Sequence, residues 1–186
     1  MARAPKVVVQ AAMSLDGFIA APGDAMDWVF EYTAAHEFPE IVQATGAMLS
    51  GRRSYDVGLR DAGKPSGEAY GGAWHGPSFV LTHNPPSDPG VTFLSGDIEA
   101  AVKTARAAAG DKDLVVVGAD VASQCLERGL VDEILVMVLP VLLGAGTPFY
   151  RAPGATRVEL ALLSSSRSDS VQLLTYQVAG EAAGGS

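Results

Sequence analysis

The sequence predicts an α/β fold with a covered, mostly parallel sheet, and the stretch 114–150 provides the main evidence. Residues 114–117 are four consecutive apolar residues, a pattern typical of a strand buried on both faces. Residues 134–141 form a second strand pattern that is too apolar to have a solvated face. A short helical pattern lies between them, and such a connection joins two strands of one covered sheet.

The helix between these strands has recognisable ends. Gly118 ends the first strand and allows another group to approach the backbone closely. Asp120 is expected to cap a helix that begins at Val121, and Gly129 is expected to end it. Val121 and Cys125 fall on one face at helical spacing. The peptide N–H groups at the start of such a helix form a natural anion site.

The remaining elements continue this pattern in both directions. Further strands are expected at 7–13, 47–50, 78–82, 91–94, 158–163 and 170–176, and helices at 38–44 and 98–109. Asp97 is expected to cap the second of these helices, which ends before Gly110. The last two strands are expected to be antiparallel. We expect a long loop at 56–76, a single domain over 1–179 and a disordered tail at 180–186.

Composition and charge exclude several classes of function. The 186 residues suit one compact domain, and 48% of them are hydrophobic. The formal net charge of −8 argues against nonspecific nucleic-acid binding but leaves room for a local basic pocket. One cysteine and three scattered histidines argue against a disulfide framework and a metal site. We expect a cytoplasmic protein without a membrane span, since no apolar run approaches ~20 residues and no secretory signal is visible.

Two groups of polar residues come directly after predicted strands. Asp16 follows the first strand, where ligands of open α/β sheets bind. An ordinary turn aspartate is the alternative, and turn statistics favour it. Gly51, Arg52 and Arg53 follow the strand at 47–50 and are typical of a phosphate-binding turn. A solvated basic turn explains the two arginines equally well, and a surface ion pair with Asp56 is a further alternative, so the residues alone leave the role of the arginines open.

Several familiar functional patterns are absent. Gly144-Ala145-Gly146 superficially matches part of a dinucleotide fingerprint, but a strand rather than a helix is expected after it. A turn or bulge is the better interpretation. The sequence has no GxSxG nucleophile turn, no Walker A loop and no zinc deaminase signature.

Six short motifs occur in a set order. They are Ser14-Leu15-Asp16-Gly17, Gly51-Arg52-Arg53-Ser54-Tyr55, Leu81-Thr82-His83, Val117-Gly118-Ala119-Asp120, Gly129-Leu130-Val131-Asp132-Glu133 and Pro140-Val141-Leu142-Leu143-Gly144-Ala145-Gly146. Together they resemble the dihydrofolate reductase-like superfamily. The greatest similarity is to the C-terminal reductase domain of the bifunctional riboflavin-biosynthesis deaminase-reductase and its stand-alone bacterial relatives. The resemblance covers about residues 6–178, and the order and spacing of the motifs carry it.

The resemblance implies a three-layer fold in which helices flank a central, mostly parallel mixed sheet with antiparallel C-terminal strands. It also implies an NADPH site at the carboxyl edge of the sheet and hydride transfer to a small heterocyclic (pterin- or riboflavin-precursor-like) or carbonyl substrate. Asp16 matches the substrate-side aspartate of the riboflavin-type reductases and is the expected catalytic residue. The expected cofactor-binding residues are Gly51, Arg52, Arg53 and Ser54 for the phosphates, Thr82 and His83 beside the 2′-phosphate, and Gly118, Ala119, Asp120 and Val121 under the pyrophosphate.

Two departures from the family's pattern bear on function. Ala119 stands where the family usually has a second glycine, next to the expected pyrophosphate. No carboxylate matches the one that anchors the pterin in folate reductases, because the comparable position falls near Ala35. Folate reduction is therefore not expected, and a ligand-binding domain without turnover is the alternative function. A homodimer is expected, because related domains pair through the region of the apolar strand 134–141.

Overall fold

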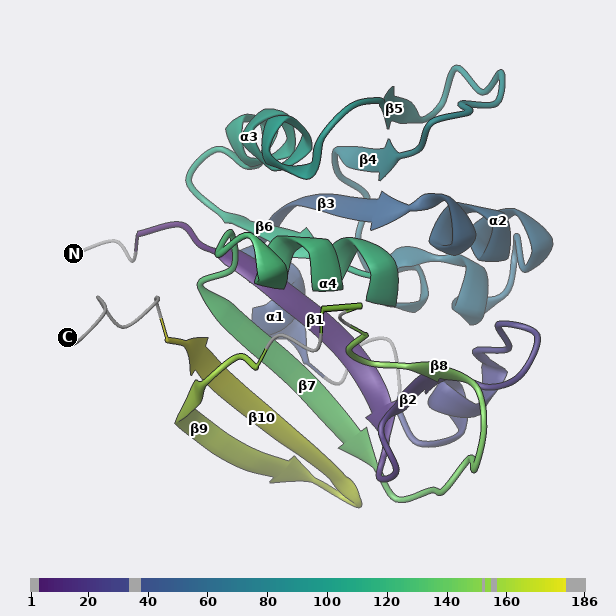
Figure 1. Cartoon of the computed structure of the whole chain (residues 1–186). Coiled ribbons are helices and arrows are strands. Elements are labelled where there is room, and N and C mark those ends of the chain that lie inside the picture. Colours follow the sequence, from purple (N-terminus) through teal and green to yellow (C-terminus); the bar gives the residue numbers. More distant parts are fainter. Residues whose placement is uncertain (1–3, 34–37, 152, 155–156, 180–186) are drawn as a thin grey trace, which may run out of the picture.

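The computed structural model describes residues 4–33, 38–151, 153–154 and 157–179, and an eight-stranded mixed sheet forms its centre (Figure 1). In order across the sheet, the strands are β5 (Thr92–Leu94), β4 (Ser78–Leu81), β3 (Thr45–Gly51), β6 (Asp113–Val116), β1 (Val7–Ser14), β7 (Glu133–Leu139), β10 (Val171–Val178) and β9 (Leu160–Ser168). A separate antiparallel pair joins β2 (Phe18–Ala20) to β8 (Thr147–Pro148).

Parallel pairing dominates the sheet. The six strands from β5 to β7 in this order pair in parallel, so their carboxyl ends face the same edge. β1 lies inside the sheet, where Val9 is in register with Val116 of β6 and with Ile134 of β7. β10 and β9 complete the sheet with antiparallel pairs. The predicted mostly parallel sheet with antiparallel C-terminal strands is thus confirmed.

The helices begin and end at residues suited to those positions. They are α1 (Pro39–Ala44), α2 (Arg52–Arg60), α3 (Ile98–Ala109) and α4 (Ala119–Glu127), together with the 3-10 helices η1 (Asp27–Glu31), η2 (Pro65–Gly67) and η3 (Ala69–Gly72). Asp97 caps α3 as predicted, because its Oδ1 accepts a 2.8 Å hydrogen bond from the Ala100 N–H. Gly129, with a φ of +64°, ends α4 and donates its N–H to the Leu126 carbonyl.

Apolar clusters cover both faces of the sheet. On one face, α3 and α4 bury residues such as Ala105 and Cys125 against Val9 and its neighbours. On the other face, Val29 of η1 packs with Leu139 and Val171. Figure 1 shows α4 on the near side of the sheet and α1 on the far side. Side chains alternate along a strand, so the even-numbered residues of β1 face the η1 side. One of these residues is Gln10, which is polar.

Three local predictions are wrong. α4 begins at Ala119, and Asp120 does not cap it: Gly118, with a φ of +90°, turns the chain into the helix early and leaves Asp120 inside the first turn. α2 runs to Arg60, so the predicted loop at 56–76 begins within a helix and also contains η2 and η3. β9 extends to Ser168, beyond its predicted end at 163. 

The predicted tail at 180–186 lies outside the described residues. Within the described ranges, none of the helices has the length and apolar character required to cross a bilayer.

Candidate functional site

A cavity of about 840 Å³ lies at the carboxyl ends of the parallel strands. It is bordered by the start of α2, the turn after β4 and the start of α4. These three segments meet because β4, β3 and β6 are adjacent and parallel. All ten predicted cofactor-binding residues line this one cavity: Gly51, Arg52, Arg53, Ser54, Thr82, His83, Gly118, Ala119, Asp120 and Val121.

Two helix N-termini face this cavity without a side-chain cap. The N-cap residues of α2 and α4 are Gly51 and Gly118, so neither helix has a side chain that bonds its first N–H groups. The first three N–H groups of each helix lack carbonyl partners within the helix. Both helix dipoles also favour an anion at these ends. The two helices therefore converge on a place that can hold phosphate groups.

Gly118 fits its position because any side chain there would be strained and crowded. Its φ is +90°, and a Cβ atom added to it would lie 2.7 Å from the Ser54 Oγ. Gly51 is less constrained, since an added Cβ would meet only a Val121 methyl group at 3.1 Å. Ala119 is the first residue of α4 and is not among the described non-glycine residues with positive φ. The departure from the family's glycine therefore introduces no backbone strain.

Arg52 joins two of the three segments that border the cavity. Its Nε donates to the Asp56 carboxylate at 2.8 Å, and a terminal nitrogen donates to the Asn84 carbonyl at 2.9 Å. The Asn84 N–H in turn donates to the Thr82 Oγ1 at 3.3 Å. The arginine is thus linked to the turn that carries Thr82 and His83.

Arg53 is paired with an acidic residue from a distant loop. Its guanidinium donates to both carboxylate oxygens of Asp24 and to the Thr147 hydroxyl. Asp24 adopts a φ of +57°, an uncommon conformation for a non-glycine residue. The Arg53 side chain is 57% exposed, which leaves part of its charge accessible from the cavity.

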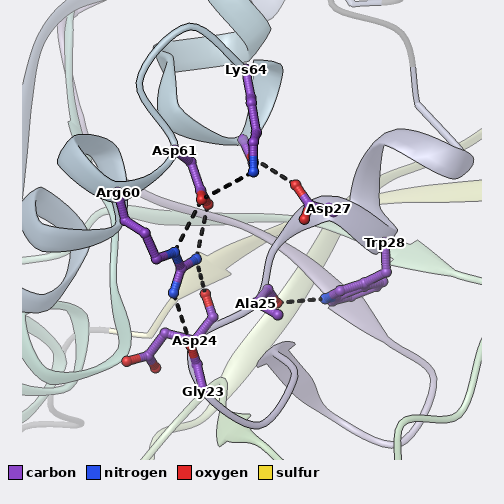
Figure 2. A network of polar contacts seen from close by, with 9 residues as sticks. Gly23, Asp24, Ala25, Asp27, Trp28, Arg60, Asp61 and Lys64 are labelled. Carbon is purple, nitrogen blue, oxygen red and sulfur yellow. Dashed lines mark hydrogen bonds and ion pairs between the residues drawn. The ribbon is translucent and has the colours of Figure 1, made fainter.

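A polar network holds the loop that carries Asp24 (Figure 2). The Arg60 guanidinium donates to both oxygens of Asp61, whose side chain is 4% exposed, and to the Gly23 and Asp24 carbonyls. The hydrogen bond from Arg60 lowers the pKa of Asp61. The Trp28 indole N–H also donates to the Ala25 carbonyl at 3.1 Å. The end of α2 thereby fixes the backbone around Asp24.

Asp16 lies apart from the other predicted site residues and is not among those that line the cavity. Its carboxylate accepts hydrogen bonds from the Ser14 hydroxyl at 2.6 Å, the Leu143 N–H at 3.1 Å and the Gly144 N–H at 2.7 Å. The Ser14 bond, followed by the backbone donors, lowers the pKa of Asp16. These contacts tie the end of β1 to the loop after β7.

Two residues of the cavity wall have no predicted role. The Tyr70 hydroxyl lies 2.6 Å from the Gln10 Oε1 and 2.8 Å from the Thr45 Oγ1. Burial raises the pKa of Tyr70 to about 12, so the phenol is neutral at physiological pH. Gln10 is detectable in the sequence as a polar residue within an apolar strand, whereas Tyr70 has no local signal in a region predicted as loop.

The family model described as "RibD C-terminal domain" matches residues 5–174. The chain belongs to this family. The solved structures that resemble the chain show that its fold is the one found in dihydrofolate reductase, as the motifs indicate.

Known proteins of this kind resemble the chain over most of its length. The uncharacterized protein YwjB of Bacillus subtilis (strain 168) is 27% identical over 161 residues, which cover 83% of this chain and 88% of YwjB. A candidate riboflavin biosynthesis protein from Shewanella sp. PV-4 has a TM-score of 0.77 at 23% identity, covering 94% of this chain and 99% of that one. Dihydrofolate reductase from Enterococcus faecalis, complexed with NADP(H), has a TM-score of 0.60 at 15% identity, covering 93% and 96%. The predicted dihydrofolate reductase-like fold is confirmed.

Proposed function

We propose that this RibD C-terminal domain is an NADPH-dependent reductase that transfers a hydride to a small heterocyclic (pterin- or riboflavin-precursor-like) or carbonyl substrate. One observation carries the proposal. Two uncapped helix N-termini and two arginines line the same cavity at the carboxyl edge of the sheet. This combination of fixed N–H donors and guanidinium groups suits a dinucleotide with three phosphates.

The residues of the cavity divide into two sets by chemistry. The first-turn N–H groups of α4, beside Gly118, would hold the pyrophosphate, since only glycine leaves room against Ser54 at that point. Arg52, with Thr82 and His83, would hold the 2′-phosphate that distinguishes NADPH from NADH. The bound cofactor would supply the hydride, and the protein would position it and exclude water.

Cofactor titration of arginine variants tests this proposal. A charge-assisted hydrogen bond contributes about 1.5–3 kcal/mol, so Arg52→Ala should weaken NADPH binding about tenfold or more. NADH binding should change little. Arg53→Ala is expected to have a smaller effect, because Asp24 engages two guanidinium nitrogens of Arg53, whereas Asp56 engages only the Nε of Arg52. Arg128→Ala is a matched control, since Arg128 pairs with Glu99 and does not line the cavity.

Each alternative has a distinct outcome. If Arg52→Ala lowers the affinities for NADPH and NADH equally, Arg52 binds the pyrophosphate and not the 2′-phosphate. If neither variant lowers the affinity for either cofactor, the two arginines belong to a solvated turn without a binding role, and the proposal is overturned. NADPH binding without oxidation across a panel of pterins, flavin precursors, quinones and aldehydes would favour a ligand-binding domain without turnover.

A further inference from the structure

A second cavity, of about 110 Å³, adjoins the first. The two share Gln10, Ala11, Tyr70 and Met137 as lining residues, so a ligand in one would be in contact with the wall of the other. The rest of its wall is mostly apolar and comes from η1, α1 and β7, with Phe30 as an example. Its volume approaches that of the roughly 150 Å³ apolar cavity that accommodates benzene in another protein. It is therefore suited to one six-membered ring.

The charges around the two cavities are unevenly placed. Among the described residues that line the small cavity, none is charged. The arginines and histidine on the described wall of the large cavity are Arg52, Arg53 and His83, all in the part assigned above to the cofactor. A phosphate or carboxylate in the small cavity would lack a counter-charge there. Burial of an unpaired anion is strongly unfavourable, which selects against such a group.

Neutral hydrogen-bonding groups stand where the two cavities meet. The Tyr70 hydroxyl bonds to the Gln10 side chain at 2.6 Å and to Thr45 at 2.8 Å. Tyr70 itself has a φ of +49°, so its position depends on a backbone conformation that is uncommon for a tyrosine. Within the described part of the chain, the Gln10 amide nitrogen donates no hydrogen bond. Every described buried side-chain polar atom has a partner, so this nitrogen is not fully buried. That nitrogen is consequently open to a ligand.

We infer that the small cavity binds the ring of a neutral, non-phosphorylated cyclic or aromatic carbonyl substrate, whose oxygen accepts a hydrogen bond from the Gln10 amide nitrogen at the junction with the large cavity. The inference rests on the proposed reductase function, since it places the carbonyl beside the cofactor. It restricts that function, because it excludes substrates that carry a phosphate or carboxylate on the bound ring.

The test compares two probes of similar shape that differ in charge. Benzaldehyde and 4-carboxybenzaldehyde are titrated by calorimetry into the protein saturated with NADP⁺. Benzaldehyde should bind at least tenfold more tightly than the carboxylated probe. Equal or tighter binding of 4-carboxybenzaldehyde, or no binding of benzaldehyde by folded protein that has bound NADP⁺, would overturn the inference. Failure to bind NADP⁺ would instead overturn the proposed function.

Two variants locate the binding. Tyr70→Phe removes the hydroxyl that donates to the Gln10 Oε1 and so fixes the orientation of the Gln10 amide. It should weaken benzaldehyde binding roughly three- to tenfold, with the affinity for NADP⁺ unchanged. Tyr176→Phe on β10, outside both cavities, is the matched control and should change neither. Thr33→Lys adds a cation to the wall of the small cavity and should reverse the preference of the two probes. Unchanged probe affinities in both Tyr70→Phe and Thr33→Lys would place the ring elsewhere and overturn the inference.

Discussion

Arg53 and Asp24 form a bidentate ion pair within the wall of the large cavity: the Arg53 Nη2 lies 2.5 Å from the Asp24 Oδ1, and the Nε lies 3.3 Å from the Oδ2. Arg60 holds the Gly23 and Asp24 carbonyls, so the acidic side chain is kept against Arg53. A phosphate that approaches Arg53 therefore competes with a carboxylate that is already in position.

Removal of this competitor should strengthen cofactor binding. Asp24→Asn should raise the affinity for NADPH about two- to fivefold, as expected for an exposed ion pair of about 0.4–1 kcal/mol. The gain should shrink at high salt, since the pair is accessible to solvent. Fluorescence titration at low and high salt provides the measurement. Asp88→Asn is the control, because Asp88 lines the same cavity but bonds to Tyr55. A weaker affinity in Asp24→Asn alone would show that Asp24 contributes to the site directly.

Asp16 gives a prediction in which stability and activity separate. Its three hydrogen bonds tie the end of β1 to the loop at 142–144, away from the cavity lining. Asp16→Asn should therefore lower the thermal midpoint, while the affinity for NADPH and the activity per folded molecule stay unchanged. Asp111→Asn, at an exposed position, is the control. A large loss of turnover without a loss of stability would establish the substrate-side role that the family resemblance implies.

The same variant has a pH signature with a definite sign. The pKa of Asp16 is lowered in the folded protein from an ordinary value of 3.8. The ionised carboxylate thus contributes stability above that value, and the contribution is lost as the pH falls through the lower, folded-state pKa. Urea unfolding of wild type and Asp16→Asn should show a full difference at pH 7 that narrows below about pH 4. A difference that stays constant down to pH 3 would contradict this assignment.

The positions of the ten predicted cofactor residues follow from local patterns and one general rule. Runs such as 114–117 identify buried parallel strands, and the carboxyl ends of such strands meet at one edge. Turns after β3, β4 and β6 therefore converge, even though Gly51 and Gly118 are far apart in the chain. Asp97 and Gly129 show that helix ends are equally readable, because each acts through groups only a few residues away.

The parts that were not predictable depend on contacts between distant residues. Arg53 and Asp24 are 29 residues apart, and Tyr70 and Gln10 are 60 apart. No local pattern links the members of either pair. The loop predicted at 56–76 rests on its many glycines and on Lys64-Pro65, yet α2 continues through Gly58 to Arg60. The bonds from Arg60 to Asp61 and to the Asp24 loop stabilise its last turn, and they too are nonlocal.

We propose a homodimer, and the structure changes where its interface should be sought. β7 pairs with β1 on one side and β10 on the other, so its edges are not available to a partner. β9 is an edge strand and exposes Leu162 by 57% and Leu163 by 50%. Leu162→Lys should convert a dimer to a monomer in light scattering at micromolar concentration. Leu142→Lys, at a loop leucine that is 70% exposed, should not. A monomeric wild type would refute the proposal.

Gly118 provides a test of the pyrophosphate position, because the two glycines that flank α4 have different surroundings. Gly118 and Gly129 flank the same helix, and both have positive φ. An added Cβ would meet the Ser54 Oγ at 2.7 Å in Gly118 but would have no heavy atom within 4 Å in Gly129. Gly118→Ala and Gly129→Ala should both lose stability, by about 1–3 kcal/mol, through backbone strain.

Only Gly118→Ala should also weaken NADPH binding, by about tenfold, because the new methyl group displaces Ser54 beside the first N–H groups of α4. NADH binding should fall by the same factor, since both cofactors carry the pyrophosphate. Thermal midpoints and fluorescence titrations of the two variants, compared at equal folded fraction, separate the effects. Equal cofactor affinities in the two variants would mean that the pyrophosphate lies away from α4, and a loss specific to NADPH would move the 2′-phosphate to Gly118 instead.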